Sequence, residues 1–408
     1  MEENLKTIND MKKNASSDKK QRDIGFEILR IISIILITCV HLLNYAGFLG
    51  NSASAGETAI LRMLYSFFLT SVNVFVLISA YFLVKSKFKI YKIIKLWLMV
   101  IFYTLFLYAI GILFFKETFT FSNLFWCFFP IWRNRYWFFT AYFLIYLISP
   151  LLNKIINHSS KKEMYLICLI ILLFSYFANR APVDNILNIC GGYNLMWFIC
   201  LYLIGGTIRI YPLKFKKYIW AIIYIVSTLL IFANYYIPSN AFLYNYYHNS
   251  PDYTAPLVLI ASVSVFMLFR DVGCKNFKIN ACVRFVSSAT FGIYLFQEAL
   301  WFKPHLYFDI LKVNNYYGRM TSVLYIFAFA LAIFCMGFLV DLIWRVFAIL
   351  IDKIFAIIQN KWTFYKTKHV GTFEFNNNKD TNDFEKENSA LDNKIYKDNN
   401  INSDNNRN

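Results

Sequence analysis

Apolar runs of about 20 residues, each long enough for a helix to cross a hydrocarbon core of roughly 30 Å, follow one another along most of this 408-residue chain. The runs are continuous and do not alternate with a period of two, so the sequence favours helices over a barrel of strands. With 58% hydrophobic and only 16% charged residues, the chain is unlike an ordinary soluble enzyme. It is predicted to be an all-α polytopic membrane protein.

Hydropathy divides the chain into three parts. A basic segment, 1–23, precedes a membrane domain, 24–360, and a polar, Asn-rich segment, 361–408, follows as a predicted disordered cytoplasmic tail. The first apolar run is too long for a signal-peptide core and is expected to be retained. Ten spans are predicted, with edges good to about four residues. They cover residues 24–48, 60–84, 92–115, 136–156, 164–180, 193–210, 217–236, 254–270, 285–302 and 321–345.

The basic residues are distributed unevenly between alternate loops. If the N-terminus is cytoplasmic, the N-terminal segment and the four inner loops contain 22 Lys and Arg residues, without counting the C-terminal segment, and the opposite loops contain seven. An excess of positive charge marks the cytoplasmic loops of a membrane protein. Both termini are therefore predicted to be cytoplasmic, and the formal net charge of +17 is explained by topology rather than by a nucleic-acid partner.

Three ionisable residues interrupt the first apolar run, GFEILRIISIILITCVHLLNY. Arg30 follows Glu27 by three positions and precedes His41 by eleven, so at about 100° per residue all three lie on one helix face. At a rise of about 1.5 Å per residue, His41 lies about 16 Å further along the helix than Arg30. Ionisable groups inside a membrane are costly and are functional candidates. An alternative remains open, in which Glu27 and Arg30 lie at the inner interface and His41 is a satisfied buried histidine.

The spacing of Glu27, Arg30 and His41 resembles the first-helix signature of acyltransferase family 3, a family of integral-membrane enzymes. Later segments are similar to further motifs of that family, in the same order: residues 72–81 (VNVFVLISAY, with Ala80 where Gly is usual), 136–138 (YWF) followed by Tyr146 and Pro150, 197–205 (WFICLYLIG) and 291–295 (FGIYL). The resemblance covers roughly residues 22–350. The first motif is the most specific. Each of the others is weak by itself, but their occurrence in the same order as in the family strengthens the resemblance.

The resemblance implies an acyltransferase of the bacterial plasma membrane that transfers groups other than amino-acyl groups. An acyl group, usually acetyl, would pass from cytoplasmic acyl-CoA to a hydroxyl of a cell-surface or exported polysaccharide. We expect acyl-CoA as a co-substrate without a bound cofactor, and membrane lipid and a glycan or glycolipid as partners. The acceptor, the acyl group, the oligomeric state and the choice between direct transfer and an acyl-enzyme relay stay open.

Residue roles follow from the matching positions. His41 would be the catalytic base, since a neutral imidazole can deprotonate a hydroxyl. Arg30 and Glu27 would be further catalytic residues, and Arg30 would also meet the anionic donor. Lys92 and Lys95 stand where the family commonly has an Arg-x-x-Arg donor contact, and Lys keeps the charge but loses the bidentate fork. The alternative for the two lysines is plain positive-inside topology.

One departure from the family concerns the segment after Gly292-Ile-Tyr-Leu. A His often follows there, but this chain has Phe296-Gln297-Glu298, so a second-histidine role does not carry over. Glu298 falls within a predicted span, where a carboxylate is costly. It is expected to line the cavity, by pairing with an Arg or by orienting His41.

Weaker candidates would meet the acceptor. Asn73 and Ser79 can form hydrogen bonds in the cavity, although polar residues at helix contacts are also ordinary packing groups. Arg135, Tyr136 and Trp137, together with Arg133, stand where an outer acceptor would arrive, and anchoring at the membrane interface is an equal alternative. The sequence contains no metal-ligand cluster, no G-x-S-x-G and no phosphate-binding Gly-rich loop.

Two rival functions share these features. An exporter or transporter of a polysaccharide or lipid-linked sugar would use the buried charges as a conduction path, and it predicts that His41 tolerates other polar residues. A glycan polymerase would need a large outer loop. The longest predicted outer loop, 237–253, is short for that, so export is the main alternative.

Overall fold

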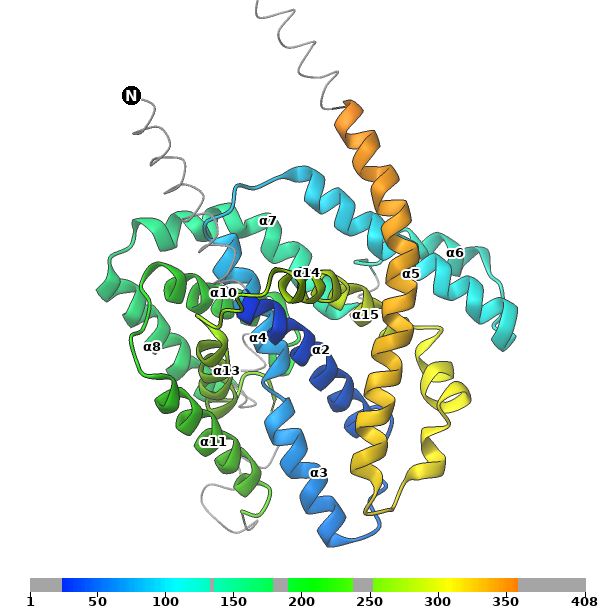
Figure 1. Cartoon of the computed structure of the whole chain (residues 1–408), viewed down its shortest axis with the longest axis horizontal. Coiled ribbons are helices and arrows are strands. Elements are labelled where there is room, and N and C mark those ends of the chain that lie inside the picture. The colour runs from blue at the N-terminus through cyan, green and yellow to red at the C-terminus, as the bar shows by residue number, and fades with distance from the viewer. Residues whose placement is uncertain (1–23, 133–135, 179–189, 238–251, 359–408) are drawn as a thin grey trace, which may run out of the picture. The chain divides into compact units, whose positions relative to one another are not determined.

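The computed structural model describes residues 24–132, 136–178, 190–237 and 252–358. Within these ranges all regular structure is helical and there are no strands (Figure 1). The all-α prediction is therefore confirmed. The predicted N-terminal segment, the predicted tail, Arg133 and Arg135 lie outside the described residues.

The helices occupy these ranges, in chain order: α2 (Ile24–Asn44), α3 (Ala55–Phe68), α4 (Ser71–Leu83), α5 (Ile90–Phe115), α6 (Phe121–Cys127), α7 (Trp137–His158), α8 (Lys161–Ala178), α10 (Leu195–Ile210), α11 (Lys217–Asn234), α13 (Pro256–Phe269), α14 (Phe277–Ser287), α15 (Thr290–Gln297) and a last helix, Ser322–Ile358. Short helical turns are Cys190–Gly192, the π-helix His305–Ile310 and Val313–Tyr316.

Seven helical segments of the described chain are long and apolar enough to cross a membrane. They are α2, Ala55–Leu83, α5, α7, α11, Phe277–Gln297 and Ser322–Ile358. The three remaining predicted spans coincide with α8, α10 and α13, which have 18, 16 and 14 residues. Each predicted span thus contains a helix, while the count of ten and the cytoplasmic placement of both termini stay predictions.

The second span begins at Ala55, earlier than the predicted residue 60, because the polar residues before it cap the helix. Ser54 Oγ accepts a hydrogen bond from the Glu57 N–H at 3.1 Å, and Glu57 Oε2 accepts one from the Ala53 N–H at 2.9 Å. The other Glu57 oxygen accepts a 2.8 Å hydrogen bond from the Ser322 hydroxyl. This buried carboxylate therefore joins the start of α3 to the start of the last helix.

α2 packs against α3, α4, α13, α14 and α15, and α10 packs against α4 and α7. Close contact between α4 and α10 depends on small residues. A Cβ on Gly205 would lie 2.8 Å from both the Leu77 carbonyl oxygen and the Ala80 Cβ. Alanine at position 80 still permits this approach, as small residues generally do where membrane helices meet.

A buried carboxylate positions α15. Asp341 on the last helix is 1% exposed, and its carboxylate accepts hydrogen bonds from Arg345 Nε at 2.8 Å and from the Tyr103 hydroxyl at 3.4 Å. A Cβ on Gly292 would overlap that hydroxyl, so only glycine lets α15 approach α5 and the last helix this closely. The end of α15, with Gln297, is thereby held against α2.

Candidate functional site

Three ionisable side chains meet where α2 and α15 end. His41 lies in the last turn of α2, and its Nδ1 is 3.1 Å from Glu298 Oε1. Lys303 Nζ lies 2.7 Å from the same oxygen and 2.9 Å from Oε2. The three side chains are 17%, 13% and 17% exposed, so the group is largely shielded from solvent. We call it the His41–Glu298–Lys303 cluster.

A turn follows α15, and this turn brings Lys303 next to Glu298. The helix ends at Gln297, earlier than the predicted residue 302, and the Lys303 N–H donates to the Ala299 carbonyl at 2.7 Å. Lys303 thus folds back onto Glu298, and its Nζ lies 4.0 Å from the ring centroid of Tyr45, just beyond α2. The cation that pairs with Glu298 is therefore Lys303, a residue that hydropathy assigned to a loop. The Arg that the sequence suggested as a partner for Glu298 is replaced by this lysine.

At the other end of α2, Glu27 holds Arg30 in place. Arg30 Nη1 donates to both Glu27 oxygens, at 2.8 and 3.0 Å. The Ser287 hydroxyl donates to Glu27 Oε2 at 2.6 Å, which ties α14 to α2. The guanidinium lies 5.5 Å from the Phe82 ring centroid. Glu27 is thus an orienting partner for Arg30, and both side chains keep some exposure, 18% and 26%.

A small cavity lies along α2 between Arg30 and His41. Ile34 and Ile37 occupy the same helix face as these two residues, because the four positions are spaced by four, three and four. The cavity is small, about 30 Å³, and is lined by Ile34, Ile37, Phe75, Phe138, Thr290, Phe291 and Tyr294. Arg30 and His41 do not line this cavity themselves, but they flank its two α2 residues on the same helix face.

Asn73 is used in packing. It is wholly buried, its Nδ2 donates to the Tyr253 carbonyl at 2.8 Å, and its Oδ1 accepts from Trp197 Nε1 at 3.0 Å. Both ends of the amide are therefore engaged in joining α4 to α10 and to the 252–254 turn. Ser79 Oγ donates to the Phe75 carbonyl at 2.9 Å and lies beside the Tyr142 hydroxyl. The structure thus favours the packing interpretation for Asn73.

Asn73→Ala is expected to destabilise the protein by about 1–3 kcal/mol, because it leaves the Trp197 indole N–H and the Tyr253 carbonyl unpaired in a buried place. Ser79→Ala is the matched control, since its carbonyl partner lies within a helix and the expected loss is smaller. The measurement is the melting temperature of the protein in detergent. Equal melting temperatures for Asn73→Ala and wild type would contradict this role.

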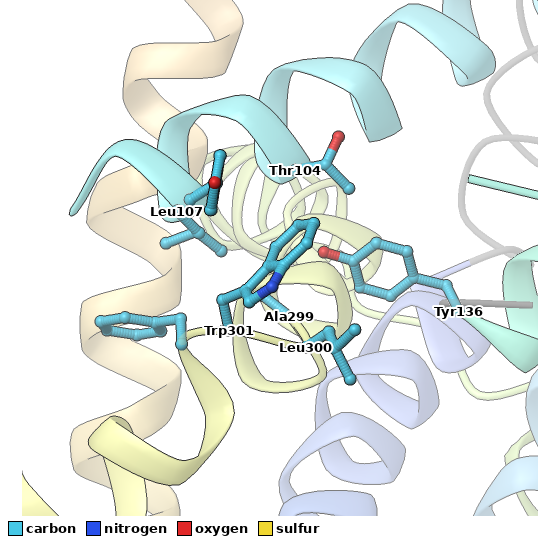
Figure 2. Close-up of a pocket in the computed structure, with 8 residues that line it drawn as sticks. Thr104, Leu107, Tyr136, Ala299, Leu300 and Trp301 are labelled. Carbon is cyan, nitrogen blue, oxygen red and sulfur yellow. The ribbon is translucent and has the colours of Figure 1, made fainter. Parts of the chain in front are cut away.

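Tyr136 and Trp137 point to different places. Tyr136 is 1% exposed, and Figure 2 shows its hydroxyl directed toward Trp301, in a narrow pocket beside the residues that follow Glu298. The Trp137 ring lies 4.6 Å from Tyr193 and 6.2 Å from Tyr253, which it faces in a stacked arrangement. We call Trp137, Tyr193 and Tyr253 the aromatic cluster.

The aromatic cluster lies within electrostatic range of Glu298, through Tyr193 and Tyr253. Tyr193 is 47% exposed, whereas Tyr253 is buried. Lys92 and Lys95, in the first turns of α5, are exposed and half-buried respectively, and their part in donor binding stays a prediction.

His305 forms a second ionisable group just after Lys303. Its Nε2 lies 3.0 Å from Glu117 Oε1, its Nδ1 lies 2.5 Å from Asp309 Oδ2, and its ring stacks on Phe115 at 4.5 Å. Burial lowers the pKa of His305, but the hydrogen bonds to Asp309 and Glu117 outweigh it and leave the pKa raised above 6.5.

Within the described residues, no group of three or more His, Cys, Asp or Glu residues can hold a metal ion.

The raised pKa of His305 predicts a pH-dependent stability. Protonated His305 pairs with Glu117 and Asp309, so this stabilisation is fully present below pH 6.5 and is lost as the pH rises through the higher folded-state pKa. Wild type should therefore lose more thermal stability than His305→Gln between about pH 6 and pH 9. Melting curves of both proteins across this range are the measurement. If the melting temperatures of the two proteins change with pH in the same way, the pKa of His305 is not raised on folding.

One of the comparisons with known proteins, with family models, covers most of the chain. A family model described as an acyltransferase domain, Acyl_transf_3, matches residues 23–342. No curated protein and no solved structure matches the chain. The matched range begins one residue before α2 and ends within the last helix, so it includes both the Glu27–Arg30 pair and the His41–Glu298–Lys303 cluster.

Proposed function

Because this chain belongs to the acyltransferase 3 family and is a multi-pass membrane acyltransferase, we propose that it moves an acyl group, most simply acetyl, from cytoplasmic acyl-CoA to a hydroxyl of a glycan at the outer face. One observation carries the proposal. α2 presents a cation at one end, a histidine–carboxylate pair at the other, and a mostly apolar cavity between them.

The Arg30 end suits the donor. CoA carries phosphates, and a guanidinium binds them through paired N–H groups. Glu27 fixes the direction of Arg30 and leaves the side chain partly exposed. The positive-inside pattern supports a cytoplasmic position for this end, and Lys92 and Lys95 would add positive charge for the nucleotide part of the donor.

The His41 end suits proton transfer. Lys303 already balances the charge of Glu298, so His41 needs no proton of its own to satisfy the carboxylate. With an Nδ1–H facing Glu298, the basic nitrogen is Nε2. Nε2 would take the proton of the acceptor hydroxyl as the oxygen attacks the acyl carbonyl carbon. The same base serves direct transfer and a relay through an acylated residue.

The aromatic cluster supports a sugar as the acceptor. An indole or phenol ring packs against the apolar face of a sugar ring, and the phenol hydroxyl adds a hydrogen-bonding group. Trp137 and the half-exposed Tyr193 lie side by side, within electrostatic range of the site through Glu298. A glycan held there would lie on the same side of the protein domain as Glu298, the carboxylate beside His41.

The donor is tested with inverted membrane vesicles that contain the full chain and its native glycan, supplied with acetyl-labelled acetyl-CoA. Label is expected in the glycan. Arg30→Lys should raise the apparent KM for acetyl-CoA on the order of tenfold, because it removes the fork that binds two phosphate oxygens.

Arg62→Lys is the matched control, since Arg62 lies over the Tyr235 ring at 5.1 Å and has no part in donor binding. An unchanged KM for Arg30→Lys would assign Arg30 a purely structural role. Failure of the wild-type protein to label the glycan would contradict the proposed donor and acceptor.

A further inference from the structure

Gln297 is a buried amide whose hydrogen-bonding capacity the fold leaves largely unused. It is the last residue of α15 and is wholly buried. Apart from a contact with the His41 imidazole, neither its Nε2 nor its Oε1 has a hydrogen-bond partner within the part of the chain that the structure describes. Burying such a group unpaired costs free energy, and a bound group that accepts a hydrogen bond from Nε2 would offset that cost.

The position of Gln297 indicates where that partner would lie. Thr290, Tyr294 and Gln297 follow one face of α15 at spacings of four and three, and the first two line the cavity. On α2, His41 follows Ile37 of the same cavity by four positions. Gln297 lies beside His41. The two helix faces thus converge, at one end of the cavity, on a base and an unpaired amide.

Two other polar side chains that could act as donors, Lys303 and Asn73, are already engaged. Lys303 contacts both oxygens of Glu298, and both ends of the Asn73 amide are occupied. The Gln297 amide is neutral, so it adds no second cation next to Lys303. A neutral N–H donor aimed at the place where His41 acts is suited to a carbonyl oxygen.

We propose that Gln297 Nε2 donates a hydrogen bond to the acyl carbonyl oxygen during transfer, an inference that rests on the proposed function. As the acceptor oxygen bonds to the carbonyl carbon, the π pair moves onto the carbonyl oxygen and His41 takes the hydroxyl proton. Gln297 stabilises the negative charge that develops. Collapse restores the C=O bond and breaks the C–S bond, and the proton passes from His41 to sulfur, so CoA leaves as the thiol.

A different role for Gln297 makes a different prediction. If its Oε1 only oriented His41, removing the amide would alter the protonation of the imidazole and shift the pH–rate profile. An amide that binds the carbonyl oxygen does not titrate. Its removal lowers kcat and leaves the midpoint of the profile unchanged.

The test uses the full chain in inverted vesicles with labelled acetyl-CoA, and it compares wild type, Gln297→Met and Gln297→His. Met has similar length and no donor, so kcat should fall on the order of 10²–10³-fold with little change in KM. His keeps a ring N–H and should recover part of the loss. Because Gln297→Met removes an unpaired buried amide, its melting temperature should equal or exceed that of wild type.

Tyr307→Phe is the matched control. Tyr307 is also wholly buried, and its hydroxyl has no hydrogen-bond partner among the described residues. Its kcat should change by less than about twofold. An unchanged kcat in Gln297→Met, a shifted pH profile, or an equal loss in Tyr307→Phe would each overturn the role of Gln297. Absence of transfer by wild type would instead overturn the proposed function itself.

Discussion

His41→Ala is expected to reduce acyl transfer on the order of 10²–10⁴-fold, because it removes the group that takes the proton of the acceptor hydroxyl. The protein should remain folded, since Lys303 still pairs with Glu298 when the imidazole is removed. The measurement is the initial rate of label transfer from acetyl-CoA to glycan in vesicles with equal amounts of each variant.

His158→Ala is the control for this prediction. His158 lies exposed in the last turn of α7, where its Nδ1 is 2.8 Å from the Lys154 carbonyl oxygen, and its loss should leave the rate unchanged. Substantial activity in His41→Ala, at a normal melting temperature, would mean that another group acts as the base.

Glu298→Gln is expected to lower the rate by about 10²-fold or more, because a neutral amide does not hold the His41 tautomer or stabilise its protonated form as a carboxylate does. It also leaves Lys303 without its counter-charge in a largely buried place. Breaking one side of a buried ion pair typically costs about 3–5 kcal/mol of stability.

A double variant separates the two consequences. Glu298→Gln combined with Lys303→Met removes both charges, so the melting temperature should return toward the wild-type value. The transfer rate should stay low, because His41 still lacks its carboxylate. Recovery of activity together with stability would show that Glu298 and Lys303 serve only the fold.

The α2 arrangement was predictable because helix geometry alone places residues 27, 30 and 41 on one face. The cost of a carboxylate in a span also identified Glu298. Lys303 was not predictable in the same way. Its contact with Glu298 depends on a chain reversal after Gln297, and hydropathy extended that span to residue 302.

Three other differences between sequence and structure have separate causes. The capping residues Ser54 and Glu57 are visible in the sequence, yet their polarity lowers hydropathy and moves the apparent start of the second span. The engagement of Asn73 depends on Trp197 and Tyr253, more than 120 positions away, so sequence alone could not separate packing from a role in the cavity. Gln297 carries no signal in hydropathy, and its burial next to His41 is visible only in the structure.

The central claim is tested most directly by the O-acyl content of the surface glycan, measured by proton NMR on glycan purified from cells that lack the gene and carry either wild type or His41→Ala at equal membrane levels. The account predicts that wild type restores an O-acyl signal and that His41→Ala does not. If the deletion removes the glycan from the surface altogether and His41→Ala brings it back, the protein exports the glycan and the account is wrong.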